Sequence, residues 1–167
     1  LYTMTSYVYK DGSEIDKVKT KFGFRTFRFD AEKGFFLNGR NIKIKGVCSH
    51  QDYGLTGRAM PDNLHHYRAE LITEMGANGY RTSHYPHAEA MMDALDELGI
   101  LVMDETRWFE ATDEGKEQLA SLIKRDRNHP SVILWSVGNE EPKHLTEQGR
   151  RITQALKAEV LKYDKSR

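Results

Sequence analysis

The chain has 167 residues, of which 38% are apolar and 30% charged, and its 25 basic and 25 acidic residues give a formal net charge of zero. This composition is typical of a globular domain, and the single cysteine, Cys48, excludes a disulfide framework. The charge balance gives no support to nucleic-acid binding, and no apolar stretch approaches the roughly 18 residues of a membrane-spanning helix. A start at Leu1, without a leader, is typical of a piece of a longer polypeptide, so the localisation stays unknown.

The first residues predict short β-strands. Residues 1–9 are rich in Tyr, Thr and Val, and the following Lys-Asp-Gly-Ser sequence is a turn signal. A further strand is predicted over 22–29, where aromatic and polar residues alternate from Phe24 onward. These elements are typical of the end of a β-domain.

A hairpin is predicted next. Residues 34–37 lead to Asn38-Gly39, and Asn-Gly is the strongest two-residue hairpin signal. The returning strand is predicted over 40–47.

From residue 41 onward, strands and helices alternate. The predicted strands cover 42–47, 78–82, 100–103 and 132–135. The predicted helices cover 61–75, 88–98, 113–127 and 142–163, the last opened by Pro142. Four β-then-α units in succession indicate an α/β fold with a parallel sheet. Two architectures remain open: a doubly wound sheet, and part of a (β/α)₈ TIM barrel, of which these residues would supply about half.

Polar residues follow every predicted strand, at the sheet edge where both architectures collect function. They are Ser49, His50, Gln51 and Asp52; Arg81, Ser83, His84 and Tyr85; Asp104, Glu105, Arg107, Trp108 and Glu110; and Asn139, Glu140 and Glu141. Arg, His and carboxylate side chains against apolar strands are costly to bury without partners, so an active site is predicted there.

Several kinds of site are disfavoured. Gly54 and Gly57 do not have the spacing of a phosphate-binding loop, and Ser136 lacks the Gly-x-Ser-x-Gly elbow of a hydrolytic triad. Cys48 is interpreted as a buried small residue at a strand end, and His84-x-x-His87 gives only weak support to a metal site. The remaining candidate is a carboxyl acid.

Glu140 is the candidate acid. At the end of an apolar strand its carboxyl group would be partly desolvated, and desolvation favours the protonated form that a general acid needs. Asn139, Arg81 and the nearby histidines would supply hydrogen bonds to a polyhydroxylated ligand, and Trp108 would supply an apolar platform for a sugar face. The alternative for Glu140 is a helix-start carboxylate, which fits Glu141 at least as well. This chemistry suggests glycoside hydrolysis.

Four segments, in chain order, resemble motifs of glycoside hydrolase family 2. They are Asn38–Arg40 with Lys45–Asp52, then Gly79–Pro86, Met103–Glu105, and Arg125–Ile133 with Trp135–Glu141. The resemblance covers the chain from about residue 20 to its end and is strongest to the β-galactosidase-like branch.

The resemblance implies a retaining hydrolase of terminal β-glycosides, above all β-galactosides, with jelly-roll, immunoglobulin-like and barrel domains. Residues 1–29 would be the last strands of the immunoglobulin-like β-sandwich, and residues 30–167 the hairpin and first four βα units of the barrel. Glu140 matches the acid/base catalyst and Asn139 the residue that contacts the sugar 2-hydroxyl. The sugar subsite is matched by His50, Arg81 and His84.

Two departures from the family pattern matter. The nucleophile is a second glutamate on a later barrel strand, which this chain does not contain, so the chain alone is expected to be inactive. Galactosidases of the family also carry Mg²⁺ on a Glu and a His after the third strand, but Phe109 falls near that Glu and the His is missing. We therefore expect no metal and no other cofactor.

Alternative functions are a β-glucuronidase or another β-glycosidase of the family, and a non-catalytic sugar-binding or assembly module. Half a barrel has two open strand edges, which predict self-association or pairing with another segment.

Overall fold

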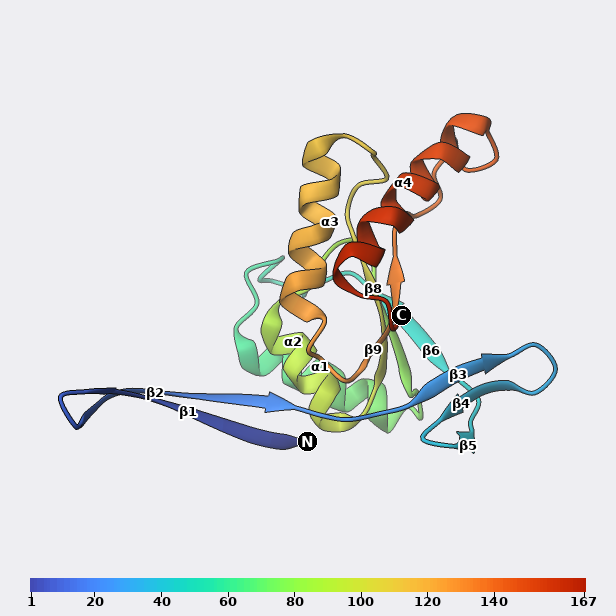
Figure 1. Ribbon diagram of the computed structural model, residues 1–167. Coiled ribbons are helices and arrows are strands. Elements are labelled where there is room, and N and C mark those ends of the chain that lie inside the picture. The colour runs from blue at the N-terminus through green and yellow to red at the C-terminus, as the bar shows by residue number, and fades with distance from the viewer.

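The computed structural model describes residues 1–167 as three separate sheets and a set of helices (Figure 1). The antiparallel strands are β1 (Tyr2–Lys10), β2 (Ser13–Phe22), β3 (Phe27–Asp30), β4 (Gly34–Leu37) and β5 (Arg40–Asn41). The parallel strands are β6 (Gly46–Ser49), β7 (Gly79–Thr82), β8 (Leu101–Glu105) and β9 (Val132–Ser136). The helices are α1 (Asp62–Glu74), α2 (Glu89–Leu98), α3 (Asp113–Asp126) and α4 (Glu147–Tyr163).

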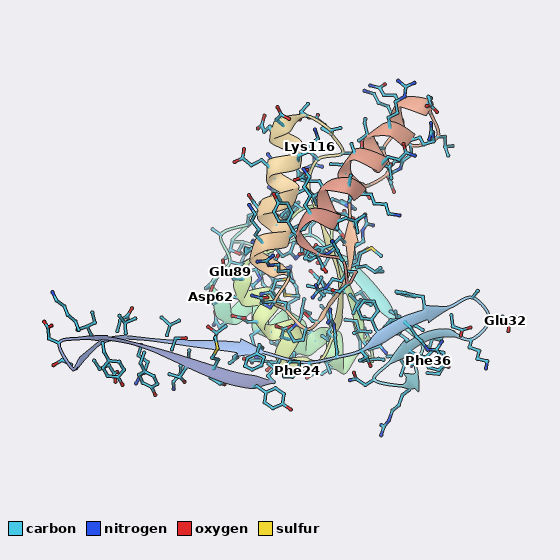
Figure 2. All side chains as sticks on the ribbon, in the orientation of Figure 1. Phe24, Glu32, Phe36, Asp62, Glu89 and Lys116 are labelled. Carbon is cyan, nitrogen blue, oxygen red and sulfur yellow. The ribbon has the colours of Figure 1, made fainter.

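β1 and β2 form a long hairpin that projects away from the rest of the molecule, with Phe24 beside its base (Figures 1 and 2). The predicted strand at the amino terminus is confirmed, but the one predicted over 22–29 is wrong. β2 ends at Phe22, β3 begins at Phe27, and the residues between them belong to no strand. The aromatic side chains there pack on one another instead, since the Phe24 ring lies 5.7 Å from Tyr2 and 5.6 Å from Phe22.

The small sheet β3–β4–β5 contains the predicted Asn38-Gly39 turn, in which φ is +49° and +78°. The returning strand predicted over 40–47 is wrong, because β5 ends at Asn41 and β6 begins at Gly46. A side chain replaces the ladder in between: the Lys45 amide donates to Asn78 Oδ1 (2.7 Å), and Asn78 Nδ2 donates to the Lys43 carbonyl (3.0 Å). The domain boundary predicted after residue 29 falls within β3 and stays a prediction.

The parallel sheet has the order β6-β7-β8-β9, so every strand pairs with its neighbours in sequence. On one face α1 and α2 cover β7 and β8 with a core that contains Ile72, Tyr80, Met91 and Leu95. A second core joins α3 to α4. The other face has no helix on it and bounds a cavity of about 290 Å³, which strand residues such as Met103 line. Helices on one face only agree with a partial (β/α)₈ barrel and not with a doubly wound sheet.

The four predicted helices are present, but the last begins later than predicted. Pro142 lies in a turn, and α4 starts at Glu147 behind Thr146, whose hydroxyl accepts from the Gly149 amide (3.1 Å). A Cβ on Gly149 would lie 1.9 Å from the Lys143 carbonyl oxygen, so the turn packs directly on the first turn of the helix. None of the helices has the length and apolar character needed to cross a membrane.

The amino end of the parallel sheet is closed by apolar packing. Phe35 of β4 packs with Leu101 of β8 and Ile133 of β9, and all three are buried. The small sheet therefore covers this end and leaves the carboxyl end as the place for polar chemistry.

Candidate active site

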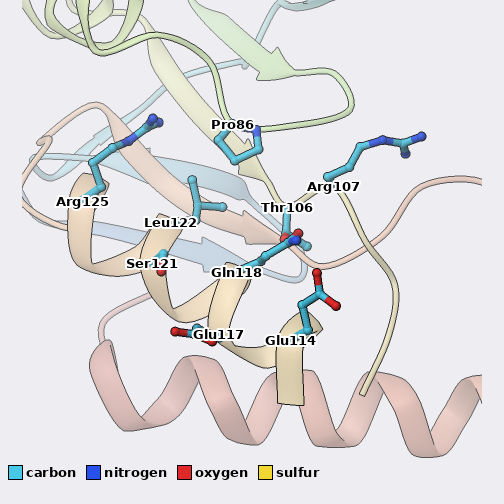
Figure 3. A pocket seen from close by; sticks show the side chains of 9 residues that line it. All are labelled: Pro86, Thr106, Arg107, Glu114, Glu117, Gln118, Ser121, Leu122 and Arg125. Carbon is cyan, nitrogen blue, oxygen red and sulfur yellow. The ribbon is translucent and has the colours of Figure 1, made fainter. Parts of the chain in front are cut away.

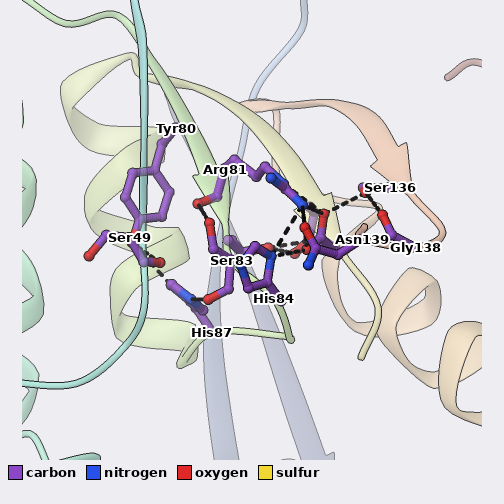
Figure 4. Close-up of polar contacts among 12 residues, drawn as sticks. Ser49, Tyr80, Arg81, Ser83, His84, His87, Ser136, Gly138 and Asn139 are labelled. Carbon is purple, nitrogen blue, oxygen red and sulfur yellow. Dashed lines mark hydrogen bonds and ion pairs between the residues drawn. The ribbon is translucent and has the colours of Figure 1, made fainter. Parts of the chain in front are cut away.

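The carboxyl ends of β7, β8 and β9 bring polar side chains together on one rim (Figure 4). Arg81 of β7 forms a two-pronged ion pair with Glu105 of β8. Its Nε lies 2.7 Å from Oε2 and its Nη2 lies 2.9 Å from Oε1. A bidentate Arg–carboxylate pair fixes the orientation of both side chains as well as their separation.

Glu105 is the centre of this network. Besides Arg81, it contacts His84 Nδ1 through Oε1 (2.9 Å) and accepts from Ser136 Oγ through Oε2 (2.6 Å). The residue is completely buried. Burial raises the pKa of Glu105, but the hydrogen bonds from Arg81, Ser136 and His84 outweigh it and hold the pKa below its ordinary range. Glu105 is therefore a carboxylate at neutral pH, with acceptor positions already used by its neighbours.

Asn139 joins the network through its carbonyl oxygen, which accepts from Arg81 Nη2 (2.7 Å). Because that contact uses the oxygen, the amide NH₂ group is left to donate to a ligand. This contact brings together three of the predicted site residues, Arg81, His84 and Asn139, on the rim.

Glu140 follows on the same rim, beyond the end of β9, with φ +34°. Its predicted partial burial is wrong for this structure, because the side chain is exposed. The reason is its place on the open rim, where no other segment of the chain covers it. No hydrogen bond within the chain occupies its carboxylate, so it is available to a ligand.

The main chain before Asn139 rests on an aromatic side chain. A Cβ on Gly138 would lie 2.8 Å from the Phe109 ring, so only glycine allows this close approach. Phe109 is itself buried and meets the His144 ring edge to face, with 4.5 Å between centroids. Phe109 therefore fixes the position of the main chain that follows β9, at the residues just before Asn139.

The other predicted site residues lie at the border of the network. The His50 ring, after β6, lies 5.0 Å from the His84 ring, which places it beside the cluster. Trp108, after β8, is 38% exposed and makes no hydrogen bond or ring contact with the cluster. Its role as a sugar platform stays a prediction.

Residues for a metal ion do not fit. The chain has no group of three or more His, Cys, Asp or Glu side chains placed to hold one. Phe109 occupies the position at which the resemblance implies a Mg²⁺-binding glutamate, and it is buried against Gly138 and His144. An apolar ring packed there leaves no oxygen ligand, so we derive no step through a metal.

A larger open depression of about 540 Å³ lies beside this rim, against α3 (Figure 3). Arg125 contributes to it, but that guanidinium is already bonded to Asp126 and to the His87 carbonyl. The Arg125 guanidinium is therefore already occupied by contacts within the chain, although it lines the depression.

The sequence reasoning missed the roles of Glu105 and Ser136. The sequence places Glu105 among the polar residues at the strand ends and in a motif, without a role of its own, and Ser136 only as a rejected nucleophile. The available signal was the placement of both at the ends of adjacent apolar strands, where β8 and β9 pair them directly.

Comparisons with known proteins show the family to which the chain belongs. The family model "Glycosyl hydrolases family 2, TIM barrel domain" matches residues 30–116 and 108–167. A curated beta-galactosidase of Bacteroides ovatus is 42% identical over 154 residues, which are 84% of this chain and 18% of that protein. A beta-glucuronidase of Bacteroides fragilis is 36% identical over 154 residues, again 84% of this chain and 22% of that protein.

Solved structures give the same result. The crystal structure of a glycosyl hydrolase family 2 member from Bacteroides cellulosilyticus superposes with a TM-score of 0.89 at 39% identity, covering 99% of this chain and 23% of that one. The chain thus spans about a fifth of the length of the proteins it matches.

Proposed function

Because this chain belongs to glycosyl hydrolase family 2, we propose that it forms the first half of the catalytic barrel of a retaining β-glycoside hydrolase. Glu140 is the acid/base residue in this proposal. The observation that carries it is the Arg81–Glu105–Asn139 network, which holds the residue before Glu140 on the rim while the Glu140 carboxylate stays open to a ligand.

The two carboxylates of the rim have different tasks. Glu105 is saturated by hydrogen bonds and serves to orient Arg81, His84 and Ser136. Glu140 protonates the oxygen of the leaving group and then removes a proton from the attacking water. The second carboxylate of a retaining mechanism, about 5–5.5 Å away, lies outside residues 1–167 in this proposal, so the chain alone is inactive.

In this proposal the rim residues form hydrogen bonds with the hydroxyl groups of the sugar. Asn139 donates its amide hydrogens to the 2-hydroxyl, since its carbonyl already accepts from Arg81. His50 and His84 border the same subsite.

Residues 1–29 are the last strands of an immunoglobulin-like domain that precedes the barrel.

We propose β-galactosides as the substrates. Glu105 already balances the positive charge of the rim residue Arg81, which favours a neutral sugar over the carboxylate of a uronic acid. β-Glucuronides are the alternative, because similar proteins carry either name. Hydrolysis of nitrophenyl β-galactoside and β-glucuronide by the full-length protein decides between them.

Glu140→Gln in the full-length protein tests the acid/base assignment. We expect turnover of alkyl glycosides to fall by about 10²–10⁴-fold, while the first step on activated aryl glycosides is nearly unchanged because their leaving groups need no proton. Azide should restore turnover of the aryl substrate, since it attacks the anomeric carbon and displaces the enzyme carboxylate without a general base. Glu141→Gln is the matched control and should behave like the wild type. Equal loss on both substrates without azide rescue contradicts the assignment.

A second candidate function is assembly of the chain with another copy of itself. β6 and β9 each pair on one side only, which supports the predicted self-association of the chain. Sedimentation of the 167-residue chain at micromolar concentration tests it, and a strictly monomeric species contradicts it.

A further inference from the structure

Behind the rim, two neighbouring carboxyl groups are buried in the interior. Asp104 of β8 and Asp126 at the end of α3 are both completely buried. Asp126 is held by Arg125, whose Nε and Nη2 lie 2.6 Å from its two carboxyl oxygens. Asp104 has no such cation: its Oδ1 accepts from the Thr82 hydroxyl (2.9 Å), and its buried Oδ2 has no donor beside it.

An ionised Asp104 would leave a buried oxygen without a donor next to another negative carboxylate. A buried acceptor without a donor costs about 1–3 kcal/mol, and more when it is charged. A single proton removes both problems, because Asp104 Oδ2–H then donates to the Asp126 carboxylate. Like-charged carboxyls in one buried site share a proton in this way.

The link to the rim runs through Thr82. Its Oγ1 donates to Asp104 Oδ1 and accepts from the Glu105 amide (2.8 Å). Asp104 therefore sets the direction of the Thr82 hydroxyl, and Thr82 fixes the main chain of Glu105. Thr82 also directly follows Arg81, the partner of Glu105.

We propose that Asp104 is a positioning residue that works as a neutral carboxylic acid, sharing one proton with Asp126 and holding Glu105 through Thr82. Burial, followed by the negative charge of Asp126, raises the pKa of Asp104 well above its ordinary range, in agreement with the geometry. The charged groups that face the pair are Arg125 on α3, His129 after it, with Nε2 4.0 Å from Asp126, and Asp96 of α2, which binds His129.

The role of Asp104 in positioning the rim rests on the proposed hydrolase function, but its protonation does not. We therefore test protonation by infrared spectroscopy of the full-length protein at neutral pH. The expected result is a carbonyl band of a protonated carboxyl group that is present in the wild type and missing in Asp104→Asn. Asp96→Asn is the matched control, because Asp96 binds His129 Nδ1 (2.7 Å) and should give no such difference. Identical spectra of the wild type and Asp104→Asn overturn the proposal.

The stability of Asp104→Asn gives a second readout. Asn offers the same donor and acceptor as the protonated acid, so the variant should fold. A raised folded pKa stabilises the protein fully below the unfolded value of about 3.9, and this contribution is lost as pH rises through the folded pKa. Over that window the folding constant of the wild type relative to Asp104→Asn should fall tenfold per pH unit. A difference that does not depend on pH, or a variant that fails to fold, overturns the proposal.

Thr82→Val tests the positioning step. We expect kcat to fall about tenfold, with the infrared band of Asp104 retained, because the link to the Glu105 amide is lost while the proton stays. Unchanged kcat in Thr82→Val overturns the positioning role, whereas an inactive wild type with the infrared band present contradicts only the hydrolase function.

Discussion

The two ends of the parallel sheet are built from the same strands and are held together in different ways. At the amino end Phe35, Leu101 and Ile133 pack as apolar side chains. At the carboxyl end Arg81 and Glu105 form an ion pair, in which two guanidinium nitrogens each donate to a different carboxylate oxygen. Apolar packing tolerates small shifts in direction, whereas a buried ion pair does not. The amino end should therefore govern stability alone, and the carboxyl end should govern both stability and chemistry.

The largest effect should come from removing a charge at the carboxyl end. Arg81→Met leaves Glu105 buried without its cation, and losing one partner of a buried pair costs about 3–5 kcal/mol of the free energy of unfolding. In the wild type the lowered pKa of Glu105 contributes stability above its unfolded pKa of about 4.3. The deficit of Arg81→Met measured by urea denaturation should therefore be largest at neutral pH and shrink as the pH falls below about 4.

The exposed pair of Arg28 and Asp30 supplies the control for that experiment. Arg28→Met should cost at most about 1 kcal/mol, as for exposed pairs in general. A similar cost for both arginines would remove the distinction between the charged rim and the surface.

A cavity at the amino end should have the next largest effect. Leu101→Ala removes a buried side chain that touches the small sheet, at a cost of about 2–5 kcal/mol. Where the variant is folded, kcat/KM should equal that of the wild type. A loss of kcat/KM at constant fold would show that the two ends are coupled.

Added volume under the rim should lower the free energy of unfolding less than Leu101→Ala does, and should lower activity more. Gly138→Ala places a methyl group 2.8 Å from the Phe109 ring, and overpacking of this kind costs about 1–3 kcal/mol. The displaced Asn139 and Glu140 should lower kcat/KM by about 10²-fold. Gly54→Ala, where nothing lies within 4 Å of the new Cβ, is the control and should leave both quantities unchanged.

The smallest effect concerns a charge near the amino end. Burial lowers the pKa of His129, but the hydrogen bond that its Nδ1 donates to Asp96 outweighs burial and raises the pKa above its ordinary value. The contribution is complete below the unfolded pKa of about 6.5 and is lost as pH rises through the folded value. The stability of the wild type relative to His129→Gln should fall over that window, while activity at constant pH is unchanged. A pH-independent difference would contradict this.

The βα units were predictable because apolar periodicity is a local property of the chain. The errors occur where a distant group decides the conformation. Asn78 binds the main chain of Lys43 and Lys45 and replaces a predicted strand, a contact across more than thirty positions. The start of α4 depends on the Thr146 cap, while Pro142, a good first-turn residue by itself, lies in the preceding turn.

The same limit applies to the site. Arg81, His84 and Asn139 were predicted from their places at strand ends, and the structure brings them together. The central role of Glu105 depends on the register that sets it beside Ser136, and register is not visible in a single strand. The roles of Glu140, His50 and Trp108 remain predictions, and Glu140→Gln tests the first of them.

The strand order β6-β7-β8-β9 has a consequence for synthesis. The ribosome releases the chain amino end first, and each new strand of this sheet finds its partner in the segment made immediately before it. No strand has to wait unpaired for a distant one, so the loop closed at each step is short. By the time β8 has emerged, the helices α1 and α2 that cover it are already available, and the core around Met91 and Leu95 can close while translation continues.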